Sequence, residues 1–249
     1  MVTTFGRDID CGGSALWRGL AASARAYRLA GSLVPWFGVG AFLLCALGLY
    51  FGLVAVRGDA AERLAHRILF LHVPATFMSM FLFAMMAFWS AVGLVVDSRL
   101  PGMLASALAP TGAAFTLLAL GTGALWGKPS AGTWWVWDAR LAAELILLVL
   151  NLAHMALHAL IDDPRRADRA GAMLALAGAI NVPILLFSAR WWDAIAASHD
   201  LTGLLAAVVA MALAFWLYSL AVTLDRLRSI ILEREGSATW AAIRVPTRP

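Results

Sequence analysis

Six long apolar stretches, separated by short polar segments, dominate the pattern of this chain. A helix needs about 20 apolar residues to cross the roughly 30 Å hydrocarbon core of a bilayer. The stretches that meet this length are residues 29–56, 73–96, 100–127, 141–161, 170–189 and 201–224. The period-2 alternation of a membrane β-barrel is absent. The pattern therefore predicts an all-α, polytopic bundle of six transmembrane helices.

The composition agrees with this pattern. Apolar side chains make up 62% of the chain and charged ones 14%, whereas soluble domains are about half apolar and a quarter charged. A soluble enzyme and an intrinsically disordered chain are both excluded. The net charge of +4 fits basic cytoplasmic loops better than nucleic-acid binding. Cys11 and Cys45 belong to no CxxC or CxxCH motif, which argues against covalent haem attachment or a cysteine zinc site.

The distribution of Lys and Arg predicts the orientation. One side of the bundle would hold 13 of the 19 basic residues, and the other side holds six. The positive-inside rule then places both termini in the cytoplasm. We expect a cytoplasmic segment at 1–28, which lacks the apolar core of a signal peptide, a membrane domain at 29–224 and a cytoplasmic tail at 225–249. No soluble domain is evident.

This topology gathers three loops on the outer side, at about 57–72, 126–140 and 190–200. The middle loop contains Trp126, Trp134, Trp135 and Trp137. Trp favours the headgroup level of membranes, so an aromatic belt is one reading. The other is a binding shelf, because Trp combines a large apolar face with one N–H donor. Such a shelf suits a large, flat, hydrophobic ligand.

Two histidines flank this shelf. His72 lies at the outer mouth of the second span, in Phe70-Leu-His-Val-Pro-Ala75, and Pro74 suits the first turn of a helix. His199 lies in the third outer loop, after Trp191-Trp192. Each histidine is either a polar anchor at the boundary or a metal ligand. Because imidazole is a common axial ligand of haem iron, the pair is a candidate bis-His haem site.

Charged residues follow the shelf at the start of the fourth span. Arg140 and Glu144 are spaced i,i+4 and can pair on one helix face. An acid within a span is costly and points to function; the alternative is that Glu144 only neutralises Arg140. Asp138 can fix the loop or contact a partner. Lys128 and Arg140 are candidates to pair with acidic groups of a ligand.

The remaining polar motifs are weaker. His154 and His158, with Asp162 one turn on, have metal-ligand spacing, but snorkelling or buried polar residues explain them better. No nucleophile–base pair, Gly-x-Ser-x-Gly elbow or HExxH motif is present. We therefore expect no enzymatic activity.

At the middle loop the sequence resembles a known signature. Trp126-Gly-Lys-Pro, Gly132-Thr-Trp-Trp-Val-Trp-Asp-Ala-Arg-Leu141 and Glu144-Leu145 resemble the WWD segment of the haem-handling proteins of cytochrome c maturation. Within that group the chain is most similar to the haem exporter protein C family. Phe70–Ala75, Asn181–Ile184 and Ser188–Trp192 match in order. The resemblance covers roughly residues 30–235.

The resemblance implies a role in cytochrome c biogenesis. Such proteins are multi-pass proteins of the bacterial inner membrane that hold b-type haem non-covalently and transiently on the periplasmic face. They pass it to a haem chaperone and work beside an ABC-type complex with a small membrane subunit. Two outer histidines ligate the iron, and the WWD segment contacts the macrocycle. His72 matches the first of these histidines.

The second family histidine is where this sequence departs. Ala196 occupies its position, and His199 stands three residues later. Three residues are close to one helical turn, so His199 replaces it if the segment is helical. The resulting hypothesis is a haem carrier with cofactor-binding residues His72, Trp126, Trp134, Trp135, Trp137, Asp138, Arg140 and His199. The alternatives are a b-type haem redox subunit, which would use histidine pairs within spans, and a haem-free solute transporter subunit with broken helices.

Overall fold

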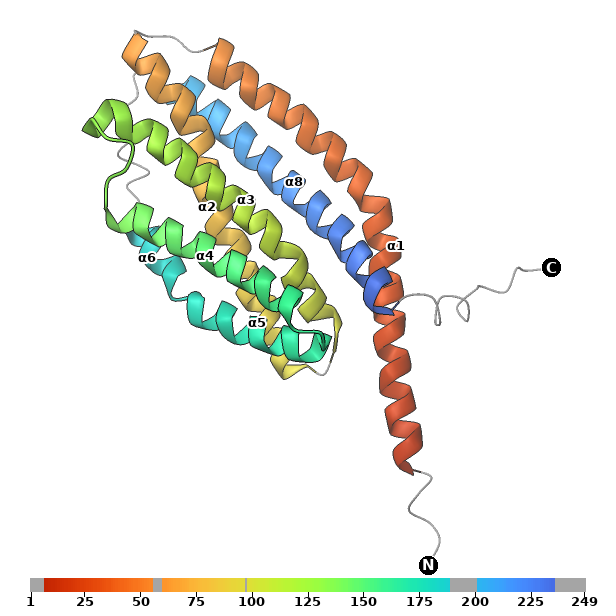
Figure 1. Ribbon diagram of the computed structural model, residues 1–249. Coiled ribbons are helices and arrows are strands. Elements are labelled where there is room, and N and C mark those ends of the chain that lie inside the picture. Colours follow the sequence, from red (N-terminus) through yellow and green to blue (C-terminus); the bar gives the residue numbers. More distant parts are fainter. Residues whose placement is uncertain (1–6, 56–59, 97, 189–200, 236–249) are drawn as a thin grey trace, which may run out of the picture.

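A computed structural model describes residues 7–55, 60–96, 98–188 and 201–235. Within these ranges the chain forms helices and no strands (Figure 1), which confirms the predicted all-α class. The elements are α1 (Arg7–Leu49), the π-helical turn η1 (Tyr50–Val54), α2 (Ala60–Val95), α3 (Leu100–Ala131), α4 (Ala139–Leu160), α5 (Pro164–Gly178), α6 (Asn181–Ser188) and α8 (Leu201–Glu235).

Six segments of the described chain are long and apolar enough to cross a membrane, by length and composition. Two of them join neighbouring elements, α1 with η1 and α5 with α6. Their bounds are Ala22–Val54, His66–Val95, Leu100–Pro129, Ala139–Leu160, Pro164–Ser188 and Thr202–Glu235. The prediction of six spans is confirmed, and the chain is an integral membrane protein.

The helices extend beyond the apolar stretches that predicted them. The expected outer loop at 57–72 is wrong, because α2 already begins at Ala60. The segment 60–72 contains good helix formers and neither Gly nor Pro, so its charges end the apolar stretch without ending the helix. The last span likewise continues to Glu235. Charge therefore marks where the apolar zone stops and does not mark where a helix stops.

Proline has different effects in two of the spans. Pro110 lies inside α3, which continues through it. Near Pro183 the helix changes course, since α5 ends at Gly178 and α6 starts at Asn181. Proline removes one N–H and its ring clashes with the carbonyl four residues earlier, which is that of Ala179. There the Val182 N–H donates to the Ala179 carbonyl at 3.2 Å, a tighter turn than an α-helix.

Two helix pairs organise the packing. In Figure 1, α1 lies beside α8 along most of its length, and α2 packs against α3. The largest buried cluster is formed by α2 through α6 and includes Phe83, Met86, Phe115, Leu147 and Leu185. A second cluster joins α2 to α8 around Phe70 and Met211. Because α1 packs mainly on α8, most of its apolar surface faces outward, as expected in lipid.

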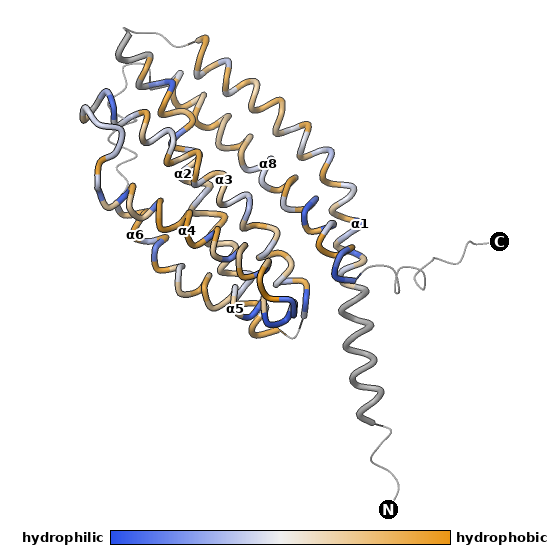
Figure 2. The backbone as a smooth tube through the Cα atoms, viewed as in Figure 1, coloured by the Kyte–Doolittle hydropathy of each residue, from blue (hydrophilic) through white to orange (hydrophobic). Residues whose placement is uncertain are grey.

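Polar residues gather at the helix ends and along one buried face. Figure 2 shows apolar colour along the middles of the helices and hydrophilic residues at the α3–α4 and α4–α5 connections. α4 is the exception within a span. Its buried face carries Glu144, Asn151 and His154, while Ile146 and Val149 point outward. α4 therefore has a buried ionisable side chain near each of its two ends, Glu144 near the start and His154 near the end.

Candidate functional site

His72 lies inside α2, where it faces the last turns of α3 and the first turn of α4. Its side chain is half-buried. The expectation that Pro74 occupies the first turn of its helix is wrong, because α2 begins 14 residues earlier at Ala60. Pro74 is buried within the helix, where it removes one backbone hydrogen bond. His72 is therefore held on a packed helix and not in a loop.

Two polar side chains contact the His72 ring, one at each nitrogen. Nδ1 lies 2.9 Å from Thr122 Oγ1 of α3. Nε2 lies 3.4 Å from Arg140 Nη1 of α4. Gly123 makes room for this arrangement, since a Cβ there would sit 3.4 Å from His72 Cε1 and 3.0 Å from Leu141 Cδ2. Three helices thus meet at one imidazole.

Asp138 fixes the start of α4 and reaches Arg140. It is the N-cap residue, with extended backbone, and its Oδ1 accepts a hydrogen bond from the Leu141 N–H at 2.7 Å. An Asp at this position satisfies a backbone donor that the helix itself leaves free. Its Oδ2 lies 3.9 Å from Arg140 Nη2. We name His72, Thr122, Asp138 and Arg140 the His72 cluster.

The tryptophan-rich loop, residues 126–140, is part helix and part turn. α3 runs to Ala131, and Gly132 caps it with a φ of 75° and an N–H bonded to the Lys128 carbonyl at 3.2 Å. This left-handed backbone favours glycine. The loop then folds back on the helix, and a Cβ at Gly127 would lie 2.9 Å from the Thr133 carbonyl oxygen. Gly127 is therefore required for this close approach.

The loop presents aromatic faces to the surroundings. Trp134 is 56% exposed and Trp137 is 77% exposed. Trp135 packs edge-on against Trp137, with ring centroids 5.3 Å apart, and its indole nitrogen is buried with no hydrogen-bond partner among the described residues. Lys128 Nζ lies 5.8 Å from the Trp134 ring centroid. We name this end of the bundle the tryptophan end.

Glu144 lies one turn below Arg140 but does not pair with it. No ion pair within 4.0 Å joins these two described residues. Glu144 is buried, at 2% exposure, and its Oε1 is 2.6 Å from Ser79 Oγ of α2. Its Oε2 has no hydrogen-bond partner in the described part of the chain. The expected i,i+4 pair forms no direct contact, because Arg140 turns to His72 and Asp138 while Glu144 turns into the bundle, although the two charges still interact over a longer distance.

The structure brings together only part of the predicted site. Arg140 contacts both His72 and Asp138, and Trp134, Trp135 and Trp137 lie on the adjoining loop. Trp126 is half-buried in the last turns of α3. His199, Ala196, Trp191 and Trp192 lie outside the described residues. Thr122 was missed by sequence reasoning, because nothing in the sequence separates its hydroxyl from the others in the same span, those of Ser106, Thr111 and Thr116.

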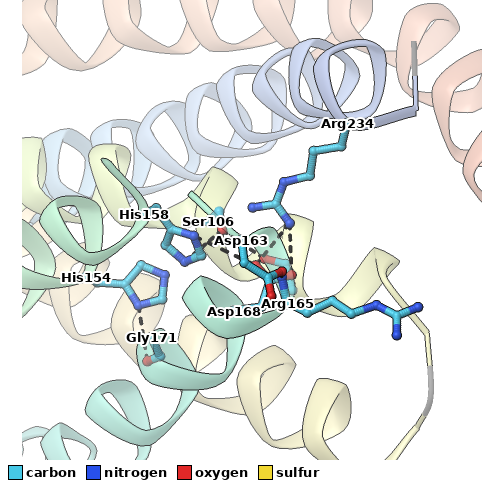
Figure 3. Close-up of polar contacts among 9 residues, drawn as sticks. Ser106, His154, His158, Asp163, Arg165, Asp168, Gly171 and Arg234 are labelled. Carbon is cyan, nitrogen blue, oxygen red and sulfur yellow. Dashed lines mark hydrogen bonds and ion pairs between the residues drawn. The ribbon is translucent and has the colours of Figure 1, made fainter. Parts of the chain in front are cut away.

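A second group of histidines lies at the other end of α4 (Figure 3). The His154 and His158 rings pack together, with centroids 4.8 Å apart. His154 Nδ1 lies 3.3 Å from the Gly171 carbonyl oxygen, and His158 Nε2 lies 3.2 Å from Ser106 Oγ. His158 Nδ1 is 3.8 Å from Asp168.

Arg234 completes this group from α8. Its Nη1 contacts both carboxylate oxygens of Asp168, at 2.9 and 3.0 Å. We name Ser106, His154, His158, Asp168 and Arg234 the His154 cluster. It joins α3, α4, α5 and α8. The predicted metal-ligand spacing does not produce a metal centre, since no group of three His, Cys, Asp or Glu suited to an ion was found among the described residues. Asp162, the third residue of the predicted spacing, belongs to no such group.

The tryptophan end combines groups that suit one kind of ligand. It offers an imidazole nitrogen on a packed helix, exposed indole faces on the neighbouring loop, and the cations Lys128 and Arg140. An imidazole binds transition metals, indole faces cover flat apolar rings, and cations pair with carboxylates. A flat, apolar metal complex with acidic side groups fits all three.

The chain matches a known family over most of its length. The family model described as "Heme exporter protein C" matches residues 16–242. The chain is 37% identical to Heme exporter protein C of Escherichia coli (strain K12) over 232 residues, which cover 90% of this chain and 94% of that protein. It is 41% identical to the protein of the same name from Bradyrhizobium diazoefficiens over 225 residues, with 86% and 85% covered. With that of Haemophilus influenzae the identity is 34% over 223 residues, covering 86% and 91%.

Proposed function

Because this chain belongs to the haem exporter protein C family, we propose that it holds haem at the tryptophan end and passes it to a haem chaperone of cytochrome c maturation. Haem is here a cargo, bound non-covalently and transiently. The observation that carries the proposal is the position of His72, whose Nε2 lies 3.4 Å from Arg140, at the end of the loop that carries the exposed Trp134 and Trp137. A porphyrin with its iron and two propionates requires this combination.

Each residue of the His72 cluster and the loop has a proposed role. His72 supplies an axial ligand from α2. The exposed faces of Trp134 and Trp137 cover the macrocycle, while Trp126 and Trp135 support the loop. Lys128 and Arg140 pair with the propionates. Asp138 positions Arg140 through their 3.9 Å contact. His199 remains the predicted second ligand.

We also propose that the tryptophan end faces the periplasm. The opposite end carries most of the basic residues of the described connections and helix ends, including Arg165, Arg166 and Arg169 in the first turns of α5 and Arg226 in α8. The positive-inside rule favours the cytoplasm for that side. This orientation puts segment 1–28 and the tail after 224 in the cytoplasm and places the membrane domain between them. It leaves haem accessible to a periplasmic chaperone.

The wider assembly is proposed from the family. An ABC-type complex with a small membrane subunit would work beside this chain, and the chain itself would make no covalent bond. The outward-facing apolar side of α1 is compatible with lipid of the inner membrane. A b-type redox subunit is less well supported, because His154 and His158 pack against each other on one helix and do not face each other from two.

The test is covalent haem loading of the chaperone in a strain that lacks this protein. The strain is complemented with the unchanged chain, with His72→Ala or with His158→Ala, at matched amounts in the membrane. We expect the unchanged chain and His158→Ala to restore loading and His72→Ala to fail. Equal loading by all three would overturn the role of His72. Loading that is independent of the protein would favour a haem-free transporter.

A further inference from the structure

The hydroxyl of Thr122 determines which nitrogen of His72 carries the proton. Thr122 Oγ1 lies 2.8 Å from the Leu118 carbonyl oxygen and 3.1 Å from that of Ala119. A hydroxyl has one proton to donate, and these carbonyls can only accept it. With its proton on one of these carbonyls, the hydroxyl accepts from His72, and Nδ1 is then the protonated nitrogen at the 2.9 Å contact.

Arg140 requires the same tautomer from the other side. A guanidinium has only donors, so the 3.4 Å contact from Arg140 Nη1 needs a lone pair on His72 Nε2. If Nε2 carried the proton, its N–H would point at an N–H of Arg140, and two donors cannot form a hydrogen bond. The two contacts come from different helices and agree on one state. His72 thus presents a lone pair at Nε2, the form in which imidazole binds a metal.

The same lone pair cannot serve Arg140 and an iron atom at once. Arg140 is 29% exposed at its side chain, and its second nitrogen reaches Asp138 at 3.9 Å. The guanidinium is therefore held over Nε2 from the rim and is not locked in the core. Withdrawing it breaks one long hydrogen bond and leaves the Asp138 contact available.

We propose that Arg140 is a displaceable cap on His72 Nε2, and that Thr122 is the positioning residue that keeps the lone pair directed at the cap. This inference rests on the proposed function and adds a means by which the chain controls haem binding and release. The cargo must displace Arg140 to gain its His72 ligand, and Arg140 competes for the lone pair whenever that bond weakens. The cap makes His72 a releasing ligand, as a carrier requires.

The first test needs no haem. Nitrogen NMR of ¹⁵N-histidine-labelled protein in lipid nanodiscs reports the state of each ring nitrogen. We expect His72 to show a protonated Nδ1 and a hydrogen-bonded, unprotonated Nε2. Arg140→Met should move the Nε2 resonance to the value of a free lone pair and keep the tautomer. Thr122→Val should produce a mixture of tautomers.

Thr116→Val is the matched control for Thr122→Val. Thr116 lies on the same helix and is buried, and its hydroxyl donates a hydrogen bond to the Gly112 carbonyl oxygen at 2.8 Å. Within the described part of the chain it makes no hydrogen bond with His72. We expect its spectrum to match that of the unchanged chain. A protonated Nε2 in the unchanged chain, or an Nε2 resonance that Arg140→Met leaves in place, would overturn the proposal.

The second test separates capping from propionate binding, since Arg140 is assigned both. Iron protoporphyrin IX dimethyl ester has no carboxylates, so it senses the cap alone. We expect Arg140→Met to bind the ester roughly tenfold more tightly. This ratio corresponds to the weakest hydrogen bonds that involve a charged donor. Lys128→Met should leave ester binding unchanged, and Arg140→Lys, which keeps a cationic donor, should restore part of the competition.

The outcomes distinguish the two proposals. Weaker or equal ester binding by Arg140→Met would overturn the cap while leaving haem binding by His72 in place. If neither free haem nor the ester gives a Soret band that depends on His72, the proposed function falls, and the cap falls with it as a control of haem. In that case the NMR result still decides how Thr122 and Arg140 hold the ring.

Discussion

The two ends of α4 each carry a histidine cluster, and both use the same device on α3. At the His72 cluster, the back-bonded hydroxyl of Thr122 accepts from Nδ1. At the His154 cluster, Ser106 bonds the Gly102 carbonyl at 3.0 Å and its hydroxyl oxygen lies 3.2 Å from His158 Nε2. In both cases a hydroxyl that bonds the backbone of its own helix also contacts a histidine from a neighbouring helix.

The second ring nitrogen faces a charged group in both clusters, but the two charged groups have opposite signs. His72 Nε2 faces the Arg140 cation at 3.4 Å, whereas His158 Nδ1 faces the Asp168 carboxylate at 3.8 Å, which Arg234 neutralises. A nitrogen that faces a donor displays a lone pair, and the Trp-rich loop lies beside it. Residues 140 and 158 are about 27 Å apart along the helix. The comparison teaches that the surroundings, and not the imidazole, distinguish the proposed binding end from the end held by an ion pair.

The largest expected effect is on stability, at the His154 cluster. Asp168→Asn leaves Arg234, with 18% of its side chain exposed, without its charge partner. An uncompensated, largely buried charge should lower the free energy of unfolding by about 3 kcal/mol. Asp225→Asn, at an exposed pair with Arg228, should cost less than about 1 kcal/mol. Denaturant unfolding in detergent measures both, and equal losses would remove the structural role of the cluster.

A steric change should act on the same end. A Cβ at Gly171 would lie 2.8 Å from His154 Cε1 and 3.0 Å from His158 Nε2. Gly171→Ala should therefore cost about 2 kcal/mol through overpacking without altering haem binding at the tryptophan end. Gly38→Ala is the control, because a Cβ there meets nothing within 4 Å. A haem spectrum changed by Gly171→Ala would show that the two ends are coupled.

The tryptophan-rich loop should respond to a change at Gly127. A Cβ there would lie 2.9 Å from the Thr133 carbonyl oxygen, so the loop must move, while Gly121 has open space. We expect Gly127→Ala to weaken haem binding roughly fivefold, about 1 kcal/mol, and Gly121→Ala to leave it unchanged. Titration with haem, followed by absorbance, measures the ratio. Equal affinities would mean that the loop does not contact the cargo.

The smallest expected effect is at Lys128. Its ammonium lies 5.8 Å from the Trp134 ring centroid and bonds the Gly132 carbonyl at 3.2 Å. An exposed cation–π contact contributes only about 0.5 kcal/mol, so Lys128→Met should barely change stability. Binding of free haem should fall two- to threefold, about 0.5 kcal/mol, and binding of the dimethyl ester should not fall. A loss that is equal for both ligands would argue against a propionate contact.

Much of the fold could be predicted from the sequence. Apolar length is a direct consequence of bilayer thickness, so all six spans were found. The helix ends were not, because the charged residues before His72 and after 224 remain helical. Helix propensity and apolar length are separate signals, and the apolar pattern reports only the second.

The site was predicted in its residue types but not in its pairings. Trp134, Trp137 and His72 carry a composition and motif signal. The partners of Arg140 do not, since i,i+4 spacing favoured Glu144 while the fold brings in His72 from α2. Thr122 and Ser79 are each one of several hydroxyls in apolar spans, and only tertiary packing shows which side chain each one meets. Sequence spacing describes contacts within a helix, and this site is built between helices.

The most direct test of the account is the absorption spectrum of the purified chain with haem, compared between the two histidine clusters. We predict that the double variant His154→Ala, His158→Ala keeps the Soret band and affinity of the unchanged chain, while His72→Ala loses or shifts that band. Correct insertion is checked for each variant by its unfolding in detergent. An unchanged band in His72→Ala, or its loss in the double variant, would contradict the assignment of the tryptophan end as the haem site.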